Sequence, residues 1–283
     1  MKRLALALLM VVAAPALPLF AARPAAAQGV PEALRGTWAR GSCAAPEALL
    51  HVTARGVVRL PAEGPARLVR FRTVRDQAGW TLGVGAGAEA PRVMLRPAED
   101  AIDLAEPDAK LRDDRLPGET RVTRWLRCQA PGVGNALLHG EGLAFLSTLE
   151  RLEAACQAGP PASCLAVLVR EADVSGDHKL SIAEVARLLR GAAWALALQQ
   201  GSEPEVIAVT TGLGSMAALA AARLVVASLD YDNDGQLTTA ELAQDRMAFP
   251  PGAGSPDGQP GTIEGLAEGA GLLRNLIERL AVE

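Results

Sequence analysis

The chain has 283 residues, of which 49% are hydrophobic and 21% are charged, and its formal net charge at pH 7 is −4. An acidic chain lacks the basic face that a nucleic acid requires, so the composition argues against a nucleic-acid partner. A chain of this length can bury a sizeable core, as one large domain or as two small ones.

The N-terminus has the three-part plan of a secretory signal peptide. A basic start precedes an apolar run over residues 4–20, and Ala25 to Ala27 supply the small residues of a cleavage site. We expect cleavage near Ala27 and a mature protein that is periplasmic or secreted. Removal of residues 1–27 takes away three cations and no acids, which moves the net charge from −4 to −7. No second apolar run is long enough to span a membrane, so no span is expected after cleavage.

Four cysteines in an exported chain are expected to form disulfide bonds. Four cysteines allow three pairings, and closeness in the sequence favours Cys156 with Cys164, which leaves Cys43 with Cys128. No pair has the CxxC spacing, so the cysteines give little support to a thiol redox site or a cysteine-rich zinc site.

Short apolar segments alternate with turn signals between Leu34 and Cys128. Strands are expected around residues 68–74, 80–84, 92–96 and 121–126. Several strands of this length between turns predict a small antiparallel barrel or sandwich over residues 28–130. The three tryptophans of this region are expected in its core, with the lining of a ligand pocket as the alternative role; they are Trp38, Trp80 and Trp125.

The pattern becomes helical after residue 130, so the predicted fold class is α+β with an all-α domain over residues 131–249. Helices are expected at 143–158, 162–172, 182–199 and 215–229, with an extra turn or short helix between the last two and another short helix after Thr239. Residues 250–261, rich in Pro and Gly, form a predicted linker. Residues 262–283 carry an apolar stripe that predicts a C-terminal helix, packed on its own domain or self-associating.

Two twelve-residue windows stand apart from the rest of the chain. They are DVSGDHKLSIAE, from Asp173 to Glu184, and DYDNDGQLTTAE, from Asp230 to Glu241. Both resemble the calcium loop of the EF-hand family, in which alternating positions supply the six to eight oxygens that Ca²⁺ takes. Leu180 and Leu237 both occupy position eight, where paired loops of this family meet in a short two-stranded contact. The resemblance implies a C-terminal EF-hand domain that binds two Ca²⁺ ions through paired loops.

The same resemblance implies a ligand set for each ion. In the second loop it comprises the carboxylates of Asp230, Asp232 and Asp234, the backbone carbonyl of Gln236 and both carboxylate oxygens of Glu241. In the first loop the corresponding ligands are Asp173, Ser175, Asp177, the backbone carbonyl of Lys179, and Glu184.

The first loop departs from the family pattern at position six, where His178 stands in place of glycine. A β-carbon at a positive φ carries a steric penalty, although histidine tolerates that region better than β-branched residues do. The first loop also has three carboxylates against four in the second, so we expect the first site to be the weaker one.

The functional hypotheses follow from the two acidic loops and from the absence of catalytic motifs. The chain has no HExxH, GxSxG or GxxxxGK[ST] motif, and we expect no enzymatic activity. The leading hypothesis is an exported calcium-binding protein whose ions are mainly structural or buffering. A calcium-dependent sensor or adaptor is the first alternative. A ligand-binding or inhibitory β region stabilised by calcium is the second. The sequence names no protein partner and leaves the oligomeric state open.

Overall fold

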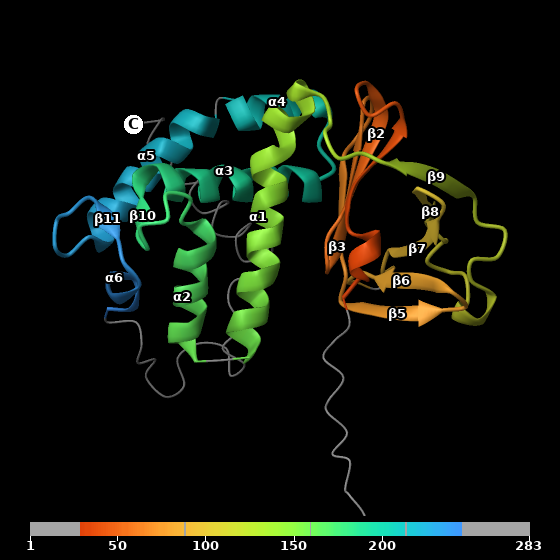
Figure 1. Cartoon of the computed structure of the whole chain (residues 1–283), viewed down its shortest axis with the longest axis horizontal. Coiled ribbons are helices and arrows are strands. Elements are labelled where there is room, and N and C mark those ends of the chain that lie inside the picture. The colour runs from red at the N-terminus through yellow and green to blue at the C-terminus, as the bar shows by residue number, and fades with distance from the viewer. Residues whose placement is uncertain (1–28, 88, 159, 213, 245–283) are drawn as a thin grey trace, which may run out of the picture.

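The computed structural model describes residues 29–87, 89–158, 160–212 and 214–244. The predicted signal peptide, the linker at 250–261 and the C-terminal helix at 262–283 lie outside these residues. Figure 1 shows strands on one side of the molecule and helices on the other, with α1 standing next to the sheet.

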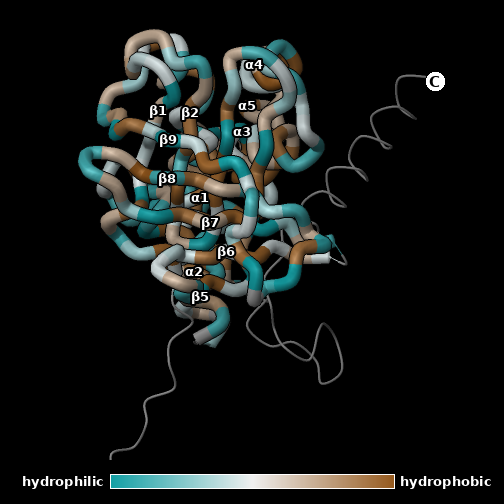
Figure 2. Tube along the Cα trace, turned by 90° about the vertical axis from the view of Figure 1, so that its right-hand side faces the viewer, coloured by the Kyte–Doolittle hydropathy of each residue, from teal (hydrophilic) through white to brown (hydrophobic). Residues whose placement is uncertain are grey.

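Nine antiparallel strands form one curved sheet, a half-barrel, in the order β4-β3-β2-β1-β9-β8-β7-β6-β5. Seen from the side of the sheet in Figure 2, the strands from β9 to β5 follow one another down the molecule. The two edge strands, β4 and β5, are consecutive in the chain and only two residues separate them, which requires the sheet to curl. The strands are β1 (Gly36–Gly41), β2 (Pro46–Val52), β3 (Gly56–Pro61), β4 (Arg67–Arg70), β5 (Thr73–Gln77), β6 (Trp80–Val84), β7 (Arg92–Ala98), β8 (Ala101–Ala105) and β9 (Val122–Arg127).

Alternation along the strands creates an apolar layer on each face of the sheet. In β2, Leu50 and Val52 join a core on one face together with Trp38 and Trp125, while Leu49 points to the opposite face. Trp80 lies in a further buried cluster with residues of the loop after β8. The core role expected of the three tryptophans is therefore confirmed.

The second face of the sheet explains why the expected architecture, a barrel or sandwich followed by a separate all-α domain, was wrong. A free-standing barrel or sandwich has a polar outer face, but here Leu49, Val58 and Leu60 make the outside of β2 and β3 apolar. Helices α1 and α3 bury this face, and the shared core includes Leu146 and Trp194. The protein is α+β, with a single half-barrel sheet in place of a closed barrel or a two-sheet sandwich. Among the described residues no EF-hand-type all-α domain is evident, because α1 and α3 share their core with the sheet.

Six helices occur among the described residues. They are α1 (Val133–Ala158), α2 (Pro161–Ala172), α3 (Ile182–Gln199), α4 (Pro204–Gly212), α5 (Gly214–Leu229) and α6 (Thr239–Ala243). The predicted helices are confirmed, including the extra one, α4, between the third and fourth. Helix α1 starts ten residues earlier than the sequence indicated, so His139, expected before the helix, lies within it and is buried.

Both predicted disulfide bonds are present, Cys43–Cys128 and Cys156–Cys164. The first joins the chain just after β1 to the chain just after β9, two strands that pair in the middle of the sheet. Closing its loop of 85 residues stabilises the fold by roughly 4 kcal/mol in the chain-entropy model. The second joins the end of α1 to α2. Two disulfide bonds suggest an oxidising compartment such as the periplasm or the extracellular space.

Helices α4 and α5 present an apolar outer surface. Five of their large hydrophobic side chains are exposed, namely Val206, Val209, Met216, Leu219 and Leu224. Within the described residues no single helix is long and apolar enough to cross a membrane. Only α4 and α5 taken together meet that length and composition, with a bend of 43° between them.

The crossing of α1 and α3 depends on a glycine in each helix. A Cβ on Gly142 in α1 would lie 2.0 Å from the ring of Trp194, and a Cβ on Gly191 in α3 would lie 2.4 Å from Phe145. No side chain fits at either position while the helices keep this separation. The two glycines therefore set how closely α3 approaches α1.

We predict that Gly142→Ala destabilises the protein by about 2–3 kcal/mol, because the new methyl group overlaps a fully buried indole. Gly140→Ala is the matched control, since it lies two residues away in α1 with open space around its Cβ. It should stabilise by up to about 1 kcal/mol through helix propensity. Urea unfolding measures both, and equal effects of the two substitutions would contradict the proposed packing.

A second prediction concerns His139, whose Nδ1 accepts a hydrogen bond from the indole nitrogen of Trp194 at 3.1 Å. Burial lowers the pKa of His139 from 6.5 to about 4. The folded state favours neutral imidazole, so this contribution to stability is present above pH 6.5 and is lost as the pH falls towards 4. His139→Asn keeps an acceptor and cannot protonate. Between pH 6.5 and 5, its unfolding free energy should fall by about 2 kcal/mol less than that of the wild type in denaturant titrations.

Candidate metal centre

The two acidic loops lie side by side in the structure. The first connects α2 to α3 and the second connects α5 to α6. They are joined by a two-stranded antiparallel pair of β10 (Leu180–Ser181) and β11 (Gln236–Leu237), in which Leu180 lies opposite Leu237. Both leucines are buried in a cluster with Val169 of α2 and Val226 of α5. Burial of these leucines thus fixes the orientation of the acidic side chains in each loop.

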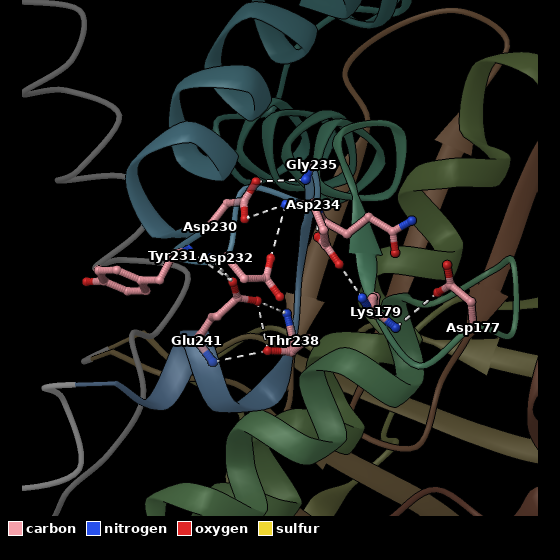
Figure 3. Close-up of polar contacts among 10 residues, drawn as sticks. Asp177, Lys179, Asp230, Tyr231, Asp232, Asp234, Gly235, Thr238 and Glu241 are labelled. Atoms are coloured by element: carbon pink, nitrogen blue, oxygen red, sulfur yellow. Dashed lines mark hydrogen bonds and ion pairs between the residues drawn. The ribbon is translucent and has the colours of Figure 1, made fainter.

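Three carboxylates converge in the second loop. Oxygen atoms of Asp230, Asp232 and Asp234 lie within 4.8 Å of one another. Asp230 accepts hydrogen bonds from the backbone N–H groups of Asp234, at 3.1 Å, and Gly235, at 2.8 Å. Gly235 has a φ of +82° and Asn233 a φ of +60°, the two positions at which the chain turns back around the cluster. Figure 3 shows Tyr231 pointing away from these carboxylates.

Glu241 places a fourth carboxylate across the second loop. One of its oxygens accepts from the backbone N–H of Tyr231 at 3.0 Å, and the other accepts from the N–H and hydroxyl of Thr238, each at 2.8 Å (Figure 3). Thr238 and Glu241 form a capping box at the start of α6. The Thr238 backbone N–H, and then its hydroxyl, hold the pKa of Glu241 below its usual range. The carboxylate is therefore ionised at neutral pH, with its position fixed by four donors, the fourth being the N–H of Asp232.

The first loop repeats the glutamate contacts of the second loop and the hydrogen bond from position six to position one. Glu184 accepts from the N–H of Val174 at 2.7 Å and of Ser181 at 2.8 Å, in a second capping box. Asp173 accepts from the N–H of His178 at 2.8 Å. His178 has a φ of +64°, as its place at position six requires. The loop therefore folds as its partner does despite the histidine.

The structure separates the predicted ligands into two groups. Among the described residues, the aspartates of the second loop are the one group of three acidic, histidine or cysteine side chains close enough to share an ion. Asp173, Ser175, Asp177 and Glu184 lie around the first loop without forming such a cluster. The two predicted carbonyl ligands stand at position seven of each loop, where Lys179 directly precedes β10 and Gln236 is the first residue of β11.

A contact between the loops was not foreseen from the sequence. The side chain of Lys179, to which the sequence assigned only a backbone carbonyl, reaches into the second loop and its ammonium group pairs with Asp234 (Figure 3). One indication of this contact was present in the sequence, namely a lysine among the predicted oxygen ligands of the first loop. The ion pair shows that this carboxylate oxygen of Asp234 is accessible to a cation. The donor set, four carboxylates of which three converge, fits a hard cation such as Ca²⁺.

A second candidate site is a groove of about 870 Å³ where the sheet meets α1. Its polar lining includes His51 and Arg55 from the sheet side and Glu150 and Glu153 from α1. Glu150 accepts from the hydroxyl of Thr53 at 2.5 Å, and burial raises its pKa. Burial also lowers the pKa of His51 to about 4. The groove thus combines two buried titratable side chains at the junction of the sheet with α1.

The chain matches no family model, no curated protein and no solved structure. The assignment of a function therefore depends on the geometry of its own residues.

Proposed function

We propose that this chain is an exported calcium-binding protein, with one ion in each of the two acidic loops and with calcium mainly structural. The observation that carries the proposal is the convergence of Asp230, Asp232 and Asp234 within 4.8 Å, opposite a Glu241 carboxylate held by four donors. Such a cluster of negative charge is unfavourable without a cation, and Ca²⁺ prefers carboxylate and carbonyl oxygens in this number.

The predicted ligands of the second loop would have distinct roles in binding calcium. Asp230, Asp232 and Asp234 would supply one oxygen each, the Gln236 carbonyl would supply another, and Glu241 would close the site from the first turn of α6. Because its hydrogen-bond donors already orient Glu241, that side chain loses less conformational entropy when an ion binds. In the first loop, Asp173, Ser175, Asp177, the Lys179 carbonyl and Glu184 would take the same roles with one carboxylate fewer.

A structural role follows from where the loops are connected. Each loop joins a pair of helices, and the buried cluster under the loops includes residues of α2, α3, α5 and α6. An ion bound to the native loops and not to the unfolded chain would stabilise this arrangement by about 2.7 kcal/mol at a hundredfold excess over its dissociation constant. Exported proteins meet calcium at concentrations that keep even weak sites filled.

A second candidate function, a calcium-dependent adaptor, is favoured by the exposed apolar surface of α4 and α5. Helix α5 leads directly into Asp230, and Met216, Leu219 and Leu224 are exposed along it. Calcium titration with circular dichroism and an apolar dye separates the two functions. Unchanged helix content and dye binding support a structural ion, whereas new apolar exposure as calcium binds supports an adaptor.

We predict that Glu241→Gln removes one of the two calcium ions counted by calorimetric titration of chelator-treated protein, because the amide cannot act as a bidentate anionic ligand. Glu184→Gln should remove the other ion. Glu205→Gln, an exposed substitution at the start of α4, is the control and should leave two. The gain in melting temperature on adding calcium should shrink in each loop variant. A wild-type protein that takes up no calcium, or a Glu241→Gln variant with unchanged stoichiometry, would refute the proposal.

A further inference from the structure

Lys179 links the two loops through its side chain. It stands at position seven of the first loop, and its ammonium group pairs with Asp234 at position five of the second (Figure 3). The two residues are 55 positions apart in the sequence, and the β10–β11 pair brings them together. The lysine side chain therefore belongs to the environment of the second loop, although its backbone belongs to the first.

The ammonium group pairs with Oδ2 of Asp234, one of the two oxygens that this carboxylate could offer to an ion. The other oxygen, Oδ1, accepts the backbone N–H of Gln236 at 2.8 Å, which leaves Oδ2 as the oxygen that Lys179 contacts. Asp230 and Asp232 lie beside it in the cluster, so the lysine neutralises part of a concentrated negative charge. The pKa of Lys179 is raised, first by its hydrogen bond to Asp234, and the lysine is fully charged at neutral pH.

We propose that Lys179 is a tethered competing cation that sets the calcium affinity of the second loop. The inference rests on the proposed function, because it concerns the same ion. Calcium must displace the ammonium group from Asp234 before that carboxylate can act as a ligand. The binding free energy is therefore reduced by the ion pair that is broken, and the loop without calcium is stabilised by the same pair.

Two consequences distinguish this role from a purely structural one. The lysine strengthens the calcium-free state and weakens calcium binding, so its removal should move stability and affinity in opposite directions. The lysine also reduces the difference in calcium affinity between the two loops. The second loop has more carboxylates than the first, but one of them is already paired with a cation. The predicted ligand of Lys179 towards the first ion is its backbone carbonyl, which a side-chain substitution leaves in place.

The test compares Lys179→Met with Lys110→Met. Lys110 is an exposed lysine outside both loops, and its substitution removes the same charge from the chain. Lys179→Met should tighten calcium binding at the second loop about threefold to fivefold, the effect of one partly exposed ion pair, and should lower the melting temperature in chelator. Lys110→Met should change neither. Unchanged or weaker binding at the second loop in Lys179→Met would overturn the inference.

A measurement on the wild-type side chains covers the case in which the variant fails to fold. After cleavage near Ala27, Lys110 and Lys179 are the only lysines. Reductive methylation with ¹³C keeps their charge and gives one methyl resonance for each. The Lys179 resonance should shift as calcium fills the second loop, while the Lys110 resonance stays in place. A Lys179 resonance that does not respond while calcium binds would refute the inference and leave the proposed function intact, whereas absence of calcium binding would refute both.

Discussion

The packing of α1 and α3 on the apolar outer face of the sheet is the constraint on which the rest of the structure depends. Leu49, Val58 and Leu60 cannot remain exposed on β2 and β3, and Trp194 of α3 lies fully buried in the core that covers them. Burial of this surface stabilises the fold by roughly 25 cal/mol for each Å² removed from water. Because α3 begins at Ile182, within the first loop, anchoring α3 also fixes one end of that loop.

Two apolar contacts with α3 and the first loop fix the position of the second loop. Helix α5 packs against α3, and Leu237 pairs with Leu180 beneath the loops. The conformation of each loop is then restricted, because backbone N–H groups of the loop must donate hydrogen bonds to its buried glutamate. Glu184 and Glu241 are each 6% exposed and each accepts from positions two, three and nine of its loop. The backbone of each loop therefore fixes the position of its glutamate carboxylate.

The helices, both disulfide bonds and the pairing of the two loops were predictable from the sequence, whereas the packing of the helices on the sheet was not. The contact of Leu180 with Leu237 followed from the resemblance of both loops to the EF-hand calcium loop, in which position eight joins paired loops. The helix boundaries followed from apolar periodicity, except at the start of α1, where Leu137 and Val133 are exposed and carry no periodic signal. The single sheet was missed because alternation shows that a strand has two faces but does not show what covers the second. Lys179 was missed for a related reason, since its partner lies in another loop and only the register of the strand pair brings it close.

The interaction of Lys179 with Asp234 and the expected export of the chain are physically consistent with each other. A cation built into a calcium site lowers its affinity, which is a disadvantage where calcium is scarce and has little effect where calcium is abundant. EF-hand loops, which the two acidic loops resemble in sequence, span dissociation constants from about 10⁻⁸ M to about 10⁻³ M, and the weak end of that range is typical of extracellular modules. In an oxidising compartment, where the two disulfide bonds persist, a weakened second loop would still be filled.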